Sequence, residues 1–505
     1  MLTGLVLAGL GLAVSGAPVA AQTAPAAPQA PVRKPAPAVR TAQSIPRAPS
    51  PRPQTVGPHT LTEAMAATYT FQPALLAERA KLRATDESVP QALAGWKPTV
   101  ILGGTAGYGD GVSRILSSPN AVTFARQTIT TQTNRDFATT QATVTQNLYT
   151  SGRVQGNVNR SKNQVMAERA NLIAQEQTSL LATVTAYVGV IQARQLLDLQ
   201  RNNEQVLSRQ LQATNDRFRV GEITRTDVAQ AEAALAGARA QRETAEGSLA
   251  TARGTFQQIV GVRPPEDMVE PQPLALPVRN EAEASAIASN NNPTVIAALF
   301  SDAAAKDAVD VALAALGPQI GLQGQSFFQE NPSARGSESS GYAVTLQLQV
   351  PLYQGGAEYA AVRAARQTQQ QTTRQIDDAK RTAVQNAVQA LSTYLGARAA
   401  ADSTRAQIRS NEIALEGVTR EAIVGSRTTL DVLNAQQLLL QSRTSLVQNL
   451  AQLVTASYQV AQAIGRLTAR DLRLPVPLYD ETAYYNAVKD RWAGLGDYAT
   501  NQPAR

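Results

Sequence analysis

The sequence predicts an α+β membrane protein in which long helices continue the wall of a β-barrel. Three observations lead to this prediction. The second half of the chain repeats the first, each half contains a helical pattern of 67 residues, and each half contains two strands long enough to cross an outer membrane. The chain is therefore expected to be one elongated protein built by internal duplication, with four strands per chain.

The composition excludes several classes of site. The 505 residues include no Cys and a single histidine, His59, so neither a thiolate centre nor a histidine cluster can form, and we expect no cofactor and no metal. Five basic residues lie in one acid-free stretch near the N-terminus and account for most of the net charge of +7, so nucleic-acid binding is not indicated. They are Arg33, Lys34, Arg40, Arg47 and Arg52.

The N-terminal region contains two segments that precede the folded body. Residues 1–21 are apolar and end in small residues, which predicts a signal peptide cleaved after Ala21; an uncleaved membrane anchor is the alternative. Residues 22–58 contain ten prolines among Ala, Gln and Arg, a composition typical of a semi-extended linker.

The body consists of two structural repeats, 59–265 and 278–470, followed by a C-terminal tail, 471–505. Matched residues differ by 220 positions at the start of the repeats and by 204 positions afterwards, so one 16-residue length difference separates the copies. The pairs offset by 220 include Pro73 and Pro293, and Pro98 and Pro318; those offset by 204 include Tyr149 and Tyr353, Gly152 and Gly356, and Gly221 and Gly425. The extra residues lie between Pro98 and Tyr149, where we expect a loop.

Alternating apolar and polar residues predict the strands, near 99–108, 137–149, 319–328 and 342–352. Strands of about 11 residues, tilted as in barrels, span the ~25 Å apolar band of an outer membrane. The last strand of each repeat is expected to lead into a helix, through turns at Tyr149–Gly152 and Tyr353–Gly356. Aromatic residues near the strand ends suit an interfacial girdle or, equally, packing in loops: Tyr149, Phe327, Phe328, Tyr342 and Tyr353.

Two proline-free helical patterns, Arg153–Arg219 and Ala357–Ile423, are about 100 Å long at 1.5 Å per residue. Gly221 and Gly425 follow their ends, as glycines commonly do after helices. A second, shorter helix then starts in each repeat, at Thr224 with Asp227 and at Thr428 with Asp431, in the pattern of a capping box. Capping boxes are also expected at Thr60 with Glu63 and at Asn280 with Glu283, and Pro90 should kink the first-repeat helix that contains it.

Four strands cannot close a barrel, and an open sheet edge is not tolerated in lipid. Two chains would give eight strands around an interior filled by side chains, whereas three would give twelve strands around a lumen. We therefore expect a homotrimer in contact with outer-membrane lipid.

The body from Thr60 to Gly465 resembles the TolC family of outer-membrane channel-tunnels. The resemblance lies in Thr60-Leu-Thr-Glu-Ala64, in the two strand-to-helix turns, and in the turns from Gly221 to Asp227 and from Gly425 to Asp431. It implies a trimeric 12-stranded barrel in the cell outer membrane, continued into the periplasm by an α-helical barrel that tapers to a closed end. It also implies docking to a periplasmic adaptor protein and to an inner-membrane ABC transporter or efflux pump.

The resemblance further implies that the two helix turns form the gate. The family's constriction acids match Asp431 and the neutral Asn434, and a closed-state link matches Arg427 with Asp227 and Thr226. Ala422 occupies the position of a tyrosine that usually reinforces this link. Plain helix capping is the alternative role for the two aspartates.

The predicted function is the outer-membrane exit duct of a type I protein secretion system, because the tail from Leu474 to Leu495 resembles that of type I secretion members. The exit duct of a multidrug efflux pump is the alternative, and a coiled-coil surface fibre or adhesin is the alternative from another class. We do not expect an enzyme, because no acid pair, nucleophile or metal cluster stands out.

Overall fold

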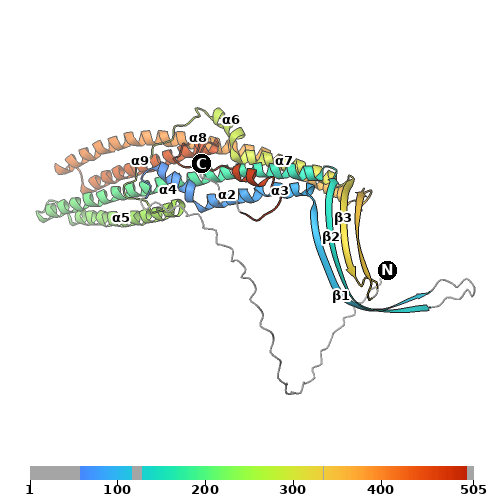
Figure 1. Cartoon of the computed structure of the whole chain (residues 1–505). Helices are drawn as coiled ribbons and strands as arrows, with labels where there is room; N and C mark the ends of the chain where they lie inside the picture. The colour runs from blue at the N-terminus through green and yellow to red at the C-terminus, as the bar shows by residue number, and fades with distance from the viewer. Residues whose placement is uncertain (1–56, 117–127, 334, 497–505) are drawn as a thin grey trace, which may run out of the picture. The chain divides into compact units, whose positions relative to one another are not determined.

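The computed structural model describes residues 57–116, 128–333 and 335–496, and the elements of the two repeats follow one another in the same order (Figure 1). The first repeat contains α1 (Leu61–Phe71), α2 (Pro73–Asp86), α3 (Ser88–Leu93), η1 (Ala94–Trp96), β1 (Thr99–Leu116), β2 (Thr128–Tyr149), α4 (Arg153–Arg219) and α5 (Arg225–Val260). The second contains α6 (Glu281–Asn291), α7 (Pro293–Ala314), β3 (Gln319–Glu330), β4 (Glu338–Gln349), α8 (Ala357–Ile423) and α9 (Thr429–Ala463), and α10 (Ala483–Val488) follows in the tail. The predicted signal peptide and all but the last two residues of the predicted linker lie outside the described residues.

The four strands form one antiparallel sheet in the order β1-β2-β3-β4. β3 and β4 have 12 residues each, close to the expected length. β1 and β2 are longer than predicted, with 18 and 22 residues. The prediction of a loop over the extra residues was wrong in part, because Gly109–Leu116 continues to pair with Thr128–Arg135 and so lengthens the hairpin.

The two faces of the sheet differ in polarity, as the period of two requires. Apolar side chains share one face and are exposed in the single chain; they include Val100, Leu102, Val144, Leu322, Phe328, Tyr342, Val344, Leu346 and Leu348. The other face carries Gln and Thr, and the Gln347 Nε2 donates to Gln323 Oε1 at 2.7 Å. The apolar face is the one suited to lipid and the polar face to a water-filled lumen.

Phe327 does not belong to the aromatic girdle proposed from the sequence. It cannot share the lipid face with its neighbour Phe328, because successive side chains point to opposite faces. Its ring instead lies over Gly341 on the polar face, where an added Cβ would come within 3.1 Å of the ring, and Phe137 covers Gly107 in the same way. A large ring over a facing glycine is a recurrent means of fixing strand register.

The helices pack as two long pairs, α4 beside α5 and α8 beside α9 (Figure 1). Small residues allow close approach, and Ala231, Leu235 and Ala238 of α5 are buried in its seam. The polar members of the α9 seam find polar partners on α8, with Asn411 Nδ2 at 2.6 Å from Ser442 Oγ and Asn449 Nδ2 at 3.0 Å from Thr404 Oγ1. In the described part of the chain, α4 alone has a window apolar enough to span a membrane by composition, and half of that window is buried inside the protein.

The helix caps agree with the sequence in all but one case. Thr60, Thr224 and Thr428 complete reciprocal capping boxes. Asn280 also caps its helix, by accepting from Glu283 N at 2.8 Å. The box is incomplete, however, because the Glu283 carboxylate accepts from Arg279 N and not from Asn280 N.

Pro90 interrupts its helix as predicted. α2 ends at Asp86 and α3 begins at Ser88, because Pro90 has no N–H to donate to the carbonyl of Asp86. The corresponding α7 has Asp310 at the matching position and continues unbroken for 22 residues.

Asp86 lies at this break and has an unusual environment. Its side chain is fully buried, and neither carboxylate oxygen has a hydrogen-bond partner among the described residues. Burial raises the pKa of Asp86 from 3.8 to about 6, against the opposing effect of the Arg169 charge. At neutral pH the protein therefore contains a buried, unpaired carboxylate.

We predict that Leu346→Arg, on the lipid face of β4, prevents normal assembly at a cost of roughly 2–4 kcal/mol, because a charge near the bilayer centre is poorly solvated. Gln347→Arg, one residue away on the lumen face, should assemble like the wild type. Heat-resistant oligomer in outer-membrane fractions measures both. Equal effects at the two positions would contradict this assignment of the faces.

We predict that Asp86→Asn stabilises the protein at neutral pH by at most about 3 kcal/mol, since one pKa unit corresponds to about 1.4 kcal/mol. The folded pKa exceeds the unfolded one, so the destabilisation is fully present above about pH 6 and disappears as the pH falls below about 4. Thermal unfolding in detergent across this range should show the difference between variant and wild type shrinking towards low pH. The exposed Asp310→Asn serves as the control, and a pH-independent difference would contradict the ionisation of Asp86.

Candidate functional site

The α4–α5 and α8–α9 turns have nearly identical backbones. Gly221 and Gly425 have φ of 80° and 82°, in the left-handed region that favours glycine. The residue after each glycine donates its N–H back to the helix at 3.0 Å, Glu222 to Arg217 O and Ser426 to Glu421 O. This closes the last helical turn in the same way in both repeats.

Each turn is followed by an aspartate that caps the next helix. Asp227 Oδ2 accepts from Thr224 N at 3.0 Å and from Thr224 Oγ1 at 2.6 Å. Asp431 Oδ2 accepts from Thr428 N at 3.0 Å and from Thr428 Oγ1 at 2.8 Å. These hydrogen bonds hold the pKa of both carboxyls below its usual range, so both aspartates are anionic at neutral pH.

Each turn also contains one ion pair, and the two pairs have opposite polarity. Arg217 Nη2 lies 2.7 Å from Glu222 Oε1, and Arg427 Nε lies 3.0 Å from Glu421 Oε2. The 204-residue offset places Arg217 of the first repeat opposite Glu421 of the second. Sequence reasoning missed Glu421, although charges on either side of a helix end were the available signal.

The structure thus pairs Arg427 inside its own turn. In the described part of the single chain, Asp227 forms its side-chain hydrogen bonds with Thr224. Thr226 is exposed at the start of α5. The link from Arg427 to Asp227 and Thr226, which the resemblance implies, stays a prediction.

The ends of the hairpins expose apolar residues, and Val220, Ile423 and Val424 are each more than 70% exposed in the single chain. Ala422 is buried beneath its turn, whereas Asn434 is exposed on α9. Contact between the two helix pairs near the ends involves Leu433 of α9, which packs against the small cluster of Leu207, Leu235 and Ala238. At this end the apolar contact between the two helix pairs is thus a small one.

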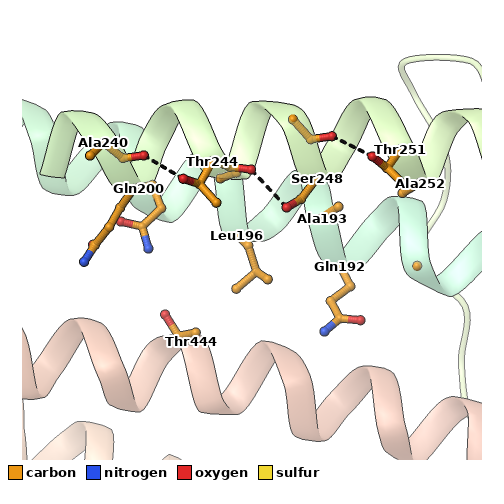
Figure 2. Close-up of a pocket in the computed structure, with 14 residues that line it drawn as sticks. Gln192, Ala193, Leu196, Gln200, Ala240, Thr244, Ser248, Thr251, Ala252 and Thr444 are labelled. Atoms are coloured by element: carbon orange, nitrogen blue, oxygen red, sulfur yellow. Dashed lines mark hydrogen bonds between the residues drawn. The ribbon is translucent and has the colours of Figure 1, made fainter. Parts of the chain in front are cut away.

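A groove of about 1000 Å³ lies farther from the turns along the helices, between α4, α5 and α9 (Figure 2). Thr444 faces it from α9, opposite Gln192 and Leu196 of α4. Along α5 the hydroxyls of Thr244, Ser248 and Thr251 donate to carbonyls of their own helix, four residues back. Their hydroxyl protons are thereby used internally, and α5 presents small side chains to the groove.

The strand-to-helix turns lie at the opposite ends of α4 and α8. Gly152 and Gly356 are the residues before these helices, with φ of 89° and 84°. Tyr149 and Tyr353 precede them and are both exposed. In the first turn Ser151 Oγ donates to Pro318 O at 2.6 Å, which fastens it to the start of β3. Over the described residues, no cluster of three or more potential metal ligands was found.

A family model for outer membrane efflux proteins matches residues 71–262 and 285–466, one segment in each repeat. The chain belongs to the outer membrane efflux protein family. This membership confirms the resemblance to the TolC family, and outer membrane proteins named TolC are among its relatives. The protein is an outer-membrane efflux channel of the kind used in tripartite systems, with a helical tunnel that extends into the periplasm.

Some relatives of this efflux-family channel are named for efflux and others for protein secretion. Outer membrane efflux protein BepC of Brucella suis is 34% identical over 440 residues, 86% of this chain and 92% of BepC. Alkaline protease secretion protein AprF of Pseudomonas aeruginosa is 27% identical over 321 residues, 60% of this chain and 64% of AprF. The crystal structure of the outer membrane protein VceC of Vibrio cholerae shares the fold, with a TM-score of 0.66 and 19% identity over 80% of this chain and 96% of VceC.

We propose that the two turns gate the channel, with Asp431 supplying the acid ring and Arg427 the closed-state link. If the link is to Asp227, then Arg427→Ser and Asp227→Asn should both raise single-channel conductance in planar bilayers, whereas Glu421→Gln should not. Asp431→Asn should leave the conductance similar and weaken cation selectivity, because the neutral Asn434 cannot replace the lost charge. If none of these variants differs from the wild type, the turns serve only to cap helices.

Proposed function

We propose that this channel is the exit duct of a type I protein secretion system, receiving its substrate from an inner-membrane ABC transporter through a periplasmic adaptor. The observation that carries the proposal is the C-terminal tail, whose sequence resembles that of type I secretion members. The name of AprF, a protein secretion component, supports the same use. Three copies of the chain would supply the twelve strands that a lumen requires.

The tail is an integral part of the helical region. Leu474 is buried in the main apolar core, Tyr479 N donates to Tyr69 Oη at 3.0 Å, and Arg79 lies over the rings of both tyrosines. Further along, Tyr484 Oη donates to Glu87 Oε1 at 2.8 Å. A tail packed in this way lies against α2 and can shape the surface that an adaptor meets.

The groove between α5 and α9 suits the adaptor. On its α5 side, small residues and hydroxyls whose protons are used within the helix would accommodate a packed helix. We propose that a helical hairpin of the adaptor lies in this groove.

Drug efflux is the second candidate function. The name of BepC, which matches the chain over most of its length, favours it. The same duct, gate and groove would serve either use, so the two functions differ in the inner-membrane partner and the substrate.

A deletion strain distinguishes the two functions. Type I secretion predicts that the culture medium loses one or more proteins that lack an N-terminal signal peptide, with little change in sensitivity to hydrophobic drugs. Complementation with the wild type and with Gln347→Arg should restore secretion, whereas Leu346→Arg should not. Increased drug sensitivity with an unchanged set of secreted proteins would favour efflux and contradict the proposal.

A further inference from the structure

The two tryptophans of the chain both lie near Lys97, at the junction of helices and sheet: Trp96 precedes it in the sequence, and Trp492 is in contact with it. Trp96 ends η1, and its carbonyl accepts from Gln146 Nε2 of β2 at 2.9 Å, so this segment is docked on the end of the sheet. Trp492 belongs to the tail, nearly 400 residues later, and Lys97 Nζ lies 5.0 Å from its ring centroid. Lys97 Nζ also donates to Arg491 O at 2.6 Å. Lys97 therefore fastens the end of the tail beside the first strand.

The backbone at the tail end folds around one guanidinium. Arg491 donates from Nε to Ala493 O and from Nη1 to Gly496 O, both at 3.1 Å. This turns the aromatic and aliphatic side chains outward, so that Trp492 is 73% exposed and Leu495 fully exposed. Just before it, the side chain of Val488 is fully buried. The exposed tip is thus held on an anchored segment.

The tip, residues 489–496, lies beside the start of β1. β1 begins at Thr99, two residues after Lys97, and its apolar face starts at Val100 and Leu102. Tryptophan and lysine are the side chains that favour the level of the lipid headgroups, because each combines an apolar body with a polar end. The helices join the strands at the periplasmic side of the barrel. The tip lies at this junction and is therefore at the level of the periplasmic leaflet of the outer membrane.

We infer that the tail end is a lipid anchor, in which Trp96, Trp492 and Leu495 enter the headgroup region of the periplasmic leaflet and Lys97 faces lipid phosphate. Charge supports lipid as the occupant: in the sequence Lys97, Lys489 and Arg491 outnumber the neighbouring acids Asp490 and Asp497, and the net positive charge suits anionic phospholipid. The anchor would set the depth at which the helical tunnel meets the membrane. It holds for either substrate class, since it depends only on the outer-membrane location.

Tryptophan fluorescence tests the anchor directly. In the variant Trp96→Phe, Trp492 is the single tryptophan of each chain, and the oligomer is reconstituted into vesicles of phosphatidylcholine and phosphatidylglycerol. We expect blue-shifted emission, protection from acrylamide, and stronger quenching by lipids brominated near the headgroup end of the acyl chain than by lipids brominated near its tip. Quenching by acrylamide alone would place Trp492 in water, and protection from both quenchers would place it against a neighbouring subunit; either result overturns the inference.

The role of Lys97 is tested in the same background. Lys97→Gln should shift Trp492 emission to the red and increase its quenching by acrylamide, because the tail end loses its fastening to the sheet. Lys380→Gln, at an exposed position on α8, is the matched control and should leave the emission unchanged. Normal oligomer size on gel filtration shows that each variant is assembled, and identical spectra with and without Lys97→Gln in the Trp96→Phe background would contradict the fastening.

Discussion

Backbone hydrogen bonding in lipid is the constraint on which the rest of this structure depends. The sheet of four strands has two free edges, on β1 and β4, and their N–H and C=O groups would have no water to bind within a bilayer. Pairing of β4 of one copy with β1 of the next satisfies both edges and generates a closed ring. Every strand leads from or into a helix, so closure of the barrel also arranges the helices into a tunnel around the same axis.

The architecture arises from an internal duplication, but the two copies differ in several structural features. The first repeat has the longer hairpin, the helix break at Pro90 and the contacts with the tail. The second repeat has the uninterrupted α7 and the polar seam between α8 and α9. The reversed ion pairs in the two helix turns show the same divergence within a conserved backbone: the glycine and the aspartate cap keep their positions, while the charges exchange sides.

Local rules predicted much of the fold. The 67-residue helices begin and end at the predicted residues, because a glycine in the left-handed region and a Thr-Asp cap act over a few residues. The paired extension of β1 and β2 was not predicted, since Thr-, Gln- and Gly-rich segments alternate weakly and strand pairing is non-local. For the candidate site, the turns were located from sequence, but the pairing of Arg427 with Glu421 inside its own turn was not, because several acids are within reach of a flexible side chain. The packing of the tail and the burial of Asp86 without a hydrogen-bond partner depend on tertiary contacts that no local pattern encodes.

The long hairpin has a consequence for the outer surface of the cell. β1 and β2 continue past the ends of β3 and β4, so their distal parts pair only with each other. Since the helices occupy the periplasmic side, these distal parts project as a two-stranded ribbon from the opposite rim, one for each subunit. A ribbon without a third strand contributes little to the stability of the barrel. It is therefore a suitable position for an inserted peptide tag that antibodies could reach on intact cells.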